Sequence, residues 1–525
     1  MPNYVANKTH EKMLIDSKIP LIKKYVCIHG HFYQPPRENP WTGEVDAEES
    51  AKPFHDWNER ISSECYEQNT KARILNAKNE LVHTVNNFTR ISFDIGPTLL
   101  SWLRRKQPEV YRAIVEADRE SVSRRNGHGN AMAQVYNHRI MPLATRRDKI
   151  TQVVWAIRDF EFHFKRKPEG MWLAEAAVDR ETLKIMAEQG ILFTVLAPHQ
   201  AKRVRHAGFG QRWRYIHHEA IDPKHVYRIL LEGGRHFHIF FYDGPISRAI
   251  AFQGLLNNGD QLASRLLNAF GNRGDREQLV SAATDGETFG HHHRFGEMAV
   301  AYSVKKIEEQ RLANMTNYAE FLGRIGSFWE VDVVENSSWS CAHGVERWRS
   351  DCGCRISHRA GWNQKWRTAL RDAFDFLKQV IDEVYEKELG VFLKDPWQAR
   401  NDYISVLLDP SKREIEKFLT RHQRKPLRAE DIVEVWKLLE AEKFSMFMYT
   451  SCGWFFDELS GIEPVQCMKF ARRAMEMVQP YLKIPLEEHV LKILADAKSN
   501  LPEQGTGADI FRQWAKPHKG VLSGV

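Results

Sequence analysis

Short apolar runs alternate with amphipathic helical patterns over the first 360 residues of this chain. The runs are strand-like and occupy residues 25–29, 90–94, 169–172, 192–196, 236–242 and 279–284. One unit is complete, because a helical pattern over 179–189 ends at Gly190 and joins the runs at 169–172 and 192–196. Strands that alternate with helices predict an α/β fold with a parallel sheet or barrel. In α/β barrels, functional groups gather at the carboxyl ends of the strands.

From about residue 360 the pattern changes to long amphipathic helices with few strand-like runs. Helices are expected over 365–389, 429–443 and 464–478. The preceding stretch is rich in Ser, Trp, Cys and Gly and has no regular period, which is typical of an ordered functional loop. We therefore predict a barrel domain over 1–335, a cleft-lining connecting loop over 336–360, and a mostly helical domain over 361–525 that packs against the barrel.

Composition excludes several classes of protein. The 525 residues carry 75 basic and 68 acidic side chains, a net charge of +7 that is too small in a chain of this length to indicate nucleic-acid binding. Seven cysteines, an odd number, are unlike a secreted disulfide framework and favour reduced thiols in a cytoplasm. The first 25 residues show neither a signal peptide nor a membrane anchor, and no later stretch has the ~18 apolar residues of a membrane helix.

Polar side chains follow several of the strand-like runs. The first run ends in HGHFYQPP (29–36), where alternation along a strand places His29 and His31 on one face and the prolines end ladder pairing. These histidines are compatible with a site or with a packed strand end. Glu175 ends WLAE, and it is either a functional carboxylate or an acid favoured at a helix start. Asp243 follows three aromatic residues, and it is either functional or an ordinary turn aspartate.

A further cluster, DGETFGHHH (285–293), ends another strand-like run. Adjacent residues of an extended chain point in opposite directions, so its three histidines cannot all bind one ion.

Five stretches, in order, resemble the motifs of glycoside hydrolase family 57. They are HGHFYQPP (29–36), YNHRIMPL (136–143), GMWLAE (170–175), YDG (242–244) and DGETFGH (285–291). Members of that family act on α-glucans and have an incomplete (β/α)7 barrel followed by helices. SWSCAHG (338–344) and TSCGWFFD (450–457) are similar to a subgroup that carries a C-terminal helical domain of unknown function. Members of this subgroup often extend beyond the position where this chain ends.

The resemblance implies a retaining glycosidase or glucanotransferase that works by double displacement on α-glucan-type oligosaccharides or polysaccharides. Glu175 would be the nucleophile and Asp243 the acid/base, provided that the two carboxyl groups lie roughly 5–5.5 Å apart and that the pKa of Asp243 is raised. The expected substrate-binding residues are His29, His31, Gln34, His138, Trp172, Asp285, Glu287, His291, Trp339 and Trp454. No cofactor is expected, and the partner is a carbohydrate. Sugar identity, linkage, chain-length preference, the choice between hydrolysis and transfer, and oligomeric state are not determined by the sequence.

Two other classes remain open at this point. In the first, His29, His31, Asp94 and one of residues 291–293 bind a divalent ion, as in mannosidases or polysaccharide deacetylases. That arrangement would leave Glu175 and Asp243 without a role. In the second, the protein binds glucan without turning it over. Separately, Cys341, His343, Cys352 and Cys354 are either a structural zinc site or free thiols in the loop that lines the cleft, and their spacing is not that of a standard zinc knuckle.

Overall fold

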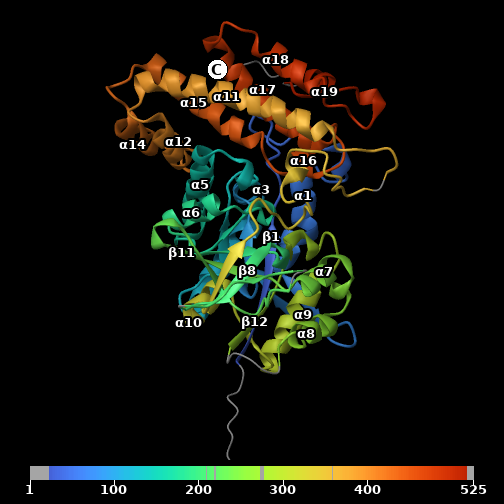
Figure 1. Cartoon of the computed structure of the whole chain (residues 1–525). Helices are drawn as coiled ribbons and strands as arrows, with labels where there is room; N and C mark the ends of the chain where they lie inside the picture. The colour runs from blue at the N-terminus through green and yellow to red at the C-terminus, as the bar shows by residue number, and fades with distance from the viewer. Residues whose placement is uncertain (1–22, 209, 218–219, 272–276, 358, 517–525) are drawn as a thin grey trace, which may run out of the picture.

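The computed structural model describes residues 23–208, 210–217, 220–271, 277–357 and 359–516. An α/β barrel is covered at one end by a layer of long helices, coloured orange to red in Figure 1. The expectation that the first 25 residues hold no signal peptide or anchor lies almost wholly outside the described residues. Among the helices that are described, none combines the length and the apolar character needed to cross a membrane.

Parallel strands form the barrel wall. Strands β12, β1, β4, β5 and β6 are neighbours in this order, and all their pairings are parallel. A parallel bridge from Gly170 to Phe193 leads on to β7, which pairs in parallel with β11. The strands are β1 (Lys23–Phe32), β4 (Ser92–Ile95), β5 (Ala131–Gln134), β6 (Met171–Trp172), β7 (Phe193–Leu196), β11 (His236–Phe241) and β12 (Glu277–Asp285). Among the described residues the barrel wall therefore has seven strands, as predicted.

The barrel stays open between β11 and β12. A strand can pair along two edges. One edge of β11 pairs in parallel with β7, and the other pairs antiparallel with β10, so neither edge is left for β12. A second sheet therefore leaves the barrel here in the order β7-β11-β10-β14-β8-β9. Its added strands are β8 (Ala201–His206), β9 (Arg214–Tyr215), β10 (Tyr227–Leu230) and β14 (Trp329–Val333). Strand β13 (Asn314–Met315) pairs with β1, and β2 (Ala72–Leu75) forms a hairpin with β3 (Leu81–Val85).

All six strand-like runs of the sequence are strands in the structure, so this part of the prediction is confirmed. Strand β5 has no counterpart in the prediction. Its sequence, Ala-Met-Ala-Gln, contains no β-branched or aromatic residue, and all four residues are buried between neighbouring strands. The sheet around it, rather than local propensity, makes this segment extended.

Helices follow the parallel strands on the outside of the barrel. They are α1 (Trp57–Ile61), α2 (Glu67–Thr70), α3 (Pro97–Lys106), α4 (Pro108–Arg124), α5 (Arg146–Phe164), α6 (Arg180–Glu188), α7 (Gly244–Phe252), α8 (Gly259–Leu267), α9 (Gly296–Glu309) and α10 (Tyr318–Ile325). Asp179 and Asp243 cap the first turns of α6 and α7 through their side chains.

The C-terminal part is helical, and the three helices predicted there are confirmed. Its elements are α11 (Trp366–Phe392), α12 (Pro396–Asp402), α13 (Ile404–Leu408), α14 (Lys412–His422), α15 (Ala429–Phe447), α16 (Cys452–Phe455), α17 (Ile462–Val478), α18 (Leu486–Leu494) and α19 (Gly507–Trp514). One apolar core runs through barrel and helices without a break. The division at residues 335 and 360 stays a prediction.

Buried charges join the barrel to the helical part. Asp148 on α5 pairs with Arg139 at 2.8 Å and with Arg400 on α12 at 2.9 Å. Arg400 also pairs with Glu442 on α15 at 2.7 Å, and Lys378 on α11 pairs with Glu442 at 3.2 Å. Because all five side chains are almost completely shielded from solvent, each charge depends on its partners. This network fixes how the helices sit on the barrel.

Candidate active site

The parallel strands bring polar side chains to one end of the barrel, facing the C-terminal helices. His31 lies near the end of β1, directly opposite Asp94 of β4 on one side and Asp285 of β12 on the other. Glu175 and Asp243 follow β6 and β11. This rim is where the prediction placed the functional groups.

Asp94 holds both histidines of the first strand. Its two carboxylate oxygens contact His29 Nε2 at 2.9 Å and His31 Nδ1 at 2.8 Å. His29 Nδ1 lies 3.0 Å from Ser92 Oγ. Burial lowers the pKa of His29, so a neutral ring that donates to Asp94 and accepts from Ser92 satisfies all of these contacts.

His31 carries a positive charge at neutral pH. Burial alone would lower its pKa, but Asp94, together with Asp285 and Glu287, outweighs burial and raises the pKa of His31 to about 9. Its Nε2 lies 3.2 Å from His138 Nε2. Burial and the His31 charge hold the pKa of His138 well below its usual value. Protonated His31 therefore donates to neutral His138, which in turn donates from Nδ1 to Ser451 Oγ at 2.6 Å.

Trp172 forms the floor under the two histidines. The imidazoles of His29 and His31 stack on its indole with centroids 4.9 and 5.1 Å away. Trp172 itself is fully buried. Trp454 is also buried, and its indole nitrogen donates to Arg367 O at 3.2 Å within the helical part. Neither indole offers an open face to a ligand, although both were predicted to contact substrate.

Glu175 has an unusual backbone conformation. Its φ of 56° lies in the left-handed region, which is uncommon for residues other than glycine, and Ala176 follows with φ 48°. The carboxylate oxygen Oε2 accepts hydrogen bonds from Trp339 Nε1 at 3.0 Å and from Ser340 Oγ at 2.5 Å. The turn and these two donors determine the direction of this carboxylate.

Asp243 starts helix α7 beside the opening of the barrel. Its Oδ1 accepts from Ile246 N at 2.9 Å, and its own backbone N donates to Ser281 O of β12 at 2.7 Å. The ring of Tyr242 lies 6.3 Å from that of Trp339. Trp339 therefore contacts Glu175 on one side and the segment of Asp243 on the other.

Two more carboxylates complete the rim. Glu287 accepts hydrogen bonds from Tyr33 N at 2.9 Å and Tyr66 OH at 2.6 Å. Burial, assisted by the charge of Asp285, raises the pKa of Glu287 to about 7. Asp285 is exposed, yet loss of hydration, together with the charges of Glu175 and Asp94, raises its pKa to about 6.

Gln34 and His291 contact neither Glu175 nor Asp243 among the hydrogen bonds of the described residues. Gln34 donates to Tyr33 O and accepts from Arg37 at 3.1 Å. His291 pairs with Glu64 at 2.5 Å, with its ring against Trp57. His291 therefore does not join His29, His31 and Asp94 in a metal site.

Three residues at the rim were not singled out from the sequence. Tyr33 stacks on His138 with centroids 3.7 Å apart, and Ser340 contacts Glu175. Gln134 ends β5 fully buried, and neither amide atom has a hydrogen-bond partner among the described residues. A buried amide of this kind needs a water or a ligand. Ser340 lies in SWSCAHG next to the predicted site residue Trp339, and this position could have indicated Ser340 from the sequence. Gln134 lies in β5, the strand that the sequence did not predict.

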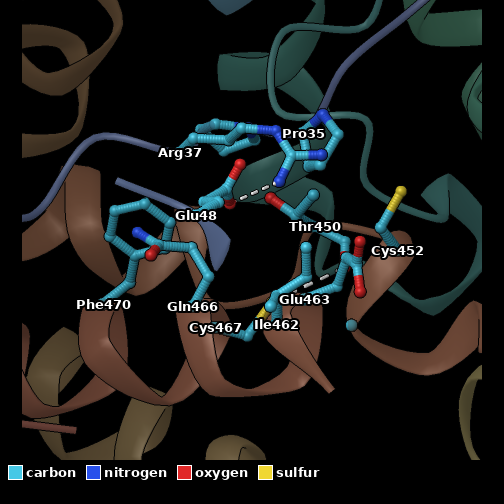
Figure 2. A pocket seen from close by; sticks show the side chains of 12 residues that line it. Pro35, Arg37, Glu48, Thr450, Cys452, Ile462, Glu463, Gln466, Cys467 and Phe470 are labelled. Carbon is cyan, nitrogen blue, oxygen red and sulfur yellow. Dashed lines mark hydrogen bonds and ion pairs between the residues drawn. The ribbon is translucent and has the colours of Figure 1, made fainter. Parts of the chain in front are cut away.

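A small pocket lies beside this rim, between the loop after β1 and helix α17. Figure 2 shows Arg37 paired with Glu48 on one wall and Glu463, Gln466 and Phe470 on the other. Cys452, also in the lining, follows the Ser451 that binds His138. The pocket borders the rim but does not contain Glu175 or Asp243.

One group of side chains has the composition and closeness of a metal site. The ligand atoms of Cys341, His343, Cys352 and Cys354 all lie within 4.8 Å of one another. Across the described residues, no other group of three or more His, Cys, Asp or Glu side chains meets the same criterion. The histidine cluster proposed above as an alternative metal centre is not among such groups.

Carboxylates, histidines and an indole at the carboxyl ends of the strands of a (β/α) barrel are typical of a carbohydrate-active barrel enzyme. The model of glycosyl hydrolase family 57 matches residues 24–332, and that of a domain of unknown function (DUF3536) matches residues 362–525. The chain belongs to glycoside hydrolase family 57, and it is a glycosidase or transglycosylase. The family resemblance drawn from the five motifs is confirmed. No curated protein sequence matches the chain significantly.

Solved structures share this architecture. An exo-type maltose-forming amylase from Pyrococcus sp. ST04 aligns with TM-score 0.66 and 17% identity over 90% of this chain and 82% of its own. A branching enzyme from Pyrococcus horikoshii aligns with TM-score 0.52 and 12% identity over 96% of each chain. A 4-alpha-glucanotransferase from Thermococcus litoralis gives TM-score 0.51 and 14% identity over 88% of this chain and 60% of its own. At these identities the likeness establishes the fold, an incomplete (β/α)7 barrel followed by a mostly helical part.

Proposed function

We propose that the protein is a retaining enzyme that cleaves or transfers α-glucan chains by double displacement. The observation that carries the proposal is Glu175, a carboxylate set by a left-handed turn and by Trp339 and Ser340 at the rim that it shares with Asp243. The amylase, glucanotransferase and branching enzyme named above support an α-glucan substrate.

Glu175 attacks the anomeric carbon and forms a covalent glycosyl-enzyme intermediate. The donors on Oε2 orient the carboxylate, so Oε1 is the attacking atom. Trp339, which is half-buried and lies between the segments of Glu175 and Asp243, provides the ring face against which the sugar packs.

Asp243 acts as the acid/base. The capping bond from Ile246 N occupies Oδ1, so we assign proton transfer to Oδ2. Asp243 first protonates the departing oxygen and then takes the proton from water or from an acceptor sugar hydroxyl. Which acceptor is used decides between hydrolysis and transfer.

The histidine and carboxylate groups bind sugar hydroxyls around the cleaved bond. Protonated His31 places a positive charge among Asp94, Asp285 and Glu287. This charge offsets part of the negative charge of these three carboxylates. Asp285, the most exposed of these carboxylates, is the group most available to a substrate.

The test is product analysis on maltoheptaose and amylose, with anomer detection by NMR at early times. The wild type is expected to give products of retained α configuration, whereas Glu175→Gln gives none at a detectable rate and keeps the wild-type melting temperature. Glu386→Gln, which changes an exposed carboxylate of α11, serves as the matched control and should remain fully active. Inverted products, or normal turnover by Glu175→Gln, would refute the mechanism.

We also place the protein in a reducing cytoplasm, because none of the seven cysteines forms a disulfide. Cell fractionation with thiol labelling of the native protein tests this location.

A further inference from the structure

Four side chains of the loop after β14 converge on one point outside the carboxylate site. They are Cys341, His343, Cys352 and Cys354, which we call the thiol cluster. Cys341 Sγ lies 3.9 Å from Cys352 Sγ, and Cys354 Sγ lies 3.5 Å from His343 Nδ1. The proposed mechanism uses none of them.

These distances are those of ligands around a tetrahedral zinc ion. Zn–S bonds of about 2.3 Å and Zn–N bonds of about 2.0–2.1 Å at the tetrahedral angle place two sulfurs about 3.8 Å apart and a sulfur and a nitrogen about 3.6 Å apart. A disulfide between Cys341 and Cys352 would instead need an S–S distance of about 2.05 Å. Three cysteines and one histidine are also a ligand set that zinc takes in closed structural sites.

The surroundings suit a negatively charged metal centre. Three thiolates, one neutral imidazole and Zn²⁺ sum to a net charge of −1. Two buried guanidinium groups hold the loop on either side: Arg367 donates to Cys354 O at 2.9 Å, and Arg347 donates to Ser340 O at 3.1 Å. Arg347 and Arg367 thus offset the excess charge and fix the backbone next to the ligands.

The loop that carries the thiol cluster contains little regular secondary structure. In residues 334–357 the structure contains one helical turn, Glu346–Trp348, and no strand. At Gly344 the backbone turns with φ 83°, and a Cβ there would lie 2.3 Å from Asn336 O, so the close return of the chain requires glycine.

We propose that the thiol cluster binds one structural Zn²⁺, which closes the loop and holds Trp339 and Ser340 against Glu175. Both residues directly precede Cys341, and both donate to the Glu175 carboxylate. The metal part of this proposal stands on the cluster alone. The positioning part rests on the function proposed for Glu175.

Metal analysis of the purified full chain tests the site. The protein, prepared in reducing buffer with ZnCl₂ and then desalted, is expected to hold one zinc per chain. The double variant Cys352→Ser/Cys354→Ser should hold less than about one tenth of that, whereas Cys467→Ala, at a buried cysteine of α17, should keep its zinc. Absence of zinc from the wild type, or full retention in the double variant, would overturn the proposal.

X-ray absorption spectroscopy of the wild-type protein identifies the zinc ligands directly, so this test does not depend on whether the variants fold. The expected zinc shell has three sulfurs at about 2.3 Å and one nitrogen at about 2.0–2.1 Å. A shell of oxygen and nitrogen alone would place the ion elsewhere and refute the site. Exchange of zinc for Co²⁺ should give the intense visible bands of tetrahedral cobalt thiolate.

The positioning part is tested by removing zinc from the wild type with a thiol reagent and a chromogenic chelator. We expect kcat on maltoheptaose to fall ~10-fold while KM changes little, and to recover when thiols and zinc are restored. Unchanged kcat in metal-free protein would refute the link to Glu175. If the wild type shows no glucan activity, that result counts against the proposed function, while metal content still decides the site.

Discussion

Glu175 and Trp339 are joined by two hydrogen bonds, one through the backbone and one through the side chains. The Trp339 backbone N donates to Glu175 O at 2.9 Å, and the indole Nε1 donates to Glu175 Oε2 at 3.0 Å. The residues are 164 positions apart in the sequence. A loop beyond the last barrel strand thereby determines how a side chain from the middle of the barrel is aimed.

Replacing Trp339 by phenylalanine should keep a ring beside Trp172 but remove the hydrogen bond to the carboxylate. Hydrogen bonds to charged groups contribute about 1.5–3 kcal/mol, so kcat/KM is expected to fall about 10- to 100-fold with little change in melting temperature. Trp514→Phe, at an exposed tryptophan of α19, is the control. Activity of Trp339→Phe within twofold of wild type would mean that the bond does not serve catalysis.

Asp243→Asn should separate catalysis from folding. Asparagine is as good an N-cap as aspartate and can keep the hydrogen bond from Ile246 N, so the free energy of unfolding should stay within about 0.5 kcal/mol of wild type. It cannot act as an acid, so kcat should fall about 10²- to 10⁴-fold. Asp243→Ala, in contrast, should lose the activity and also about 1 kcal/mol of stability. Steady-state kinetics and urea unfolding of both variants give the comparison.

His31 should make the protein less stable in alkali. Its pKa rises from 6.5 to about 9 on folding, so its stabilising contribution is complete below pH 6.5 and is lost as the pH increases through 9. At 1.36 kcal/mol per unit, the loss amounts to at most about 3 kcal/mol. Glu287, whose pKa is about 7, is largely deprotonated above pH 8, so the decline in stability above that pH reports His31. Urea unfolding between pH 8 and 9.5 should show a steeper decline for wild type than for His31→Asn, and equal slopes would contradict the charge assignment.

Asp148→Asn should loosen the helical part from the barrel. The surrounding cations hold the pKa of Asp148 below its usual value although burial opposes this, so the group is ionised in the folded protein. Removing its charge leaves Arg139 buried without its carboxylate partner and leaves Arg400 with Glu442 alone, at a cost of about 3–5 kcal/mol in unfolding free energy.

The control for this variant is Glu386→Gln, which breaks the exposed pair with Arg147 and should cost less than about 1 kcal/mol. Equal melting temperatures for the two variants would show that burial does not strengthen the Asp148 network.

Much of the barrel is predictable because its strands are locally encoded. Each of the six runs overlaps a strand of the structure, and the polar residues that follow them mark the functional rim. The four-residue strand β5 is not predicted from its own sequence, because its extended conformation depends on pairing with the strands on both sides, β4 and β6. For the same reason the second sheet through β10 and β14 is not visible in the sequence, since these two strands pair although they lie about 100 residues apart, and such distant partners leave no local pattern.

The sequence by itself determined the family, the order of the motifs and the identity of the two candidate carboxylates, because these depend on residue type and spacing. Only the tertiary structure decided which side chains meet. It placed Asp94 between His29 and His31, moved His291 to Glu64, and buried Trp454 in the helical core. It also gathered four ligand atoms from a loop whose spacing alone was uninformative. These contacts depend on how distant segments pack, and packing is a property of the whole chain rather than of any one stretch.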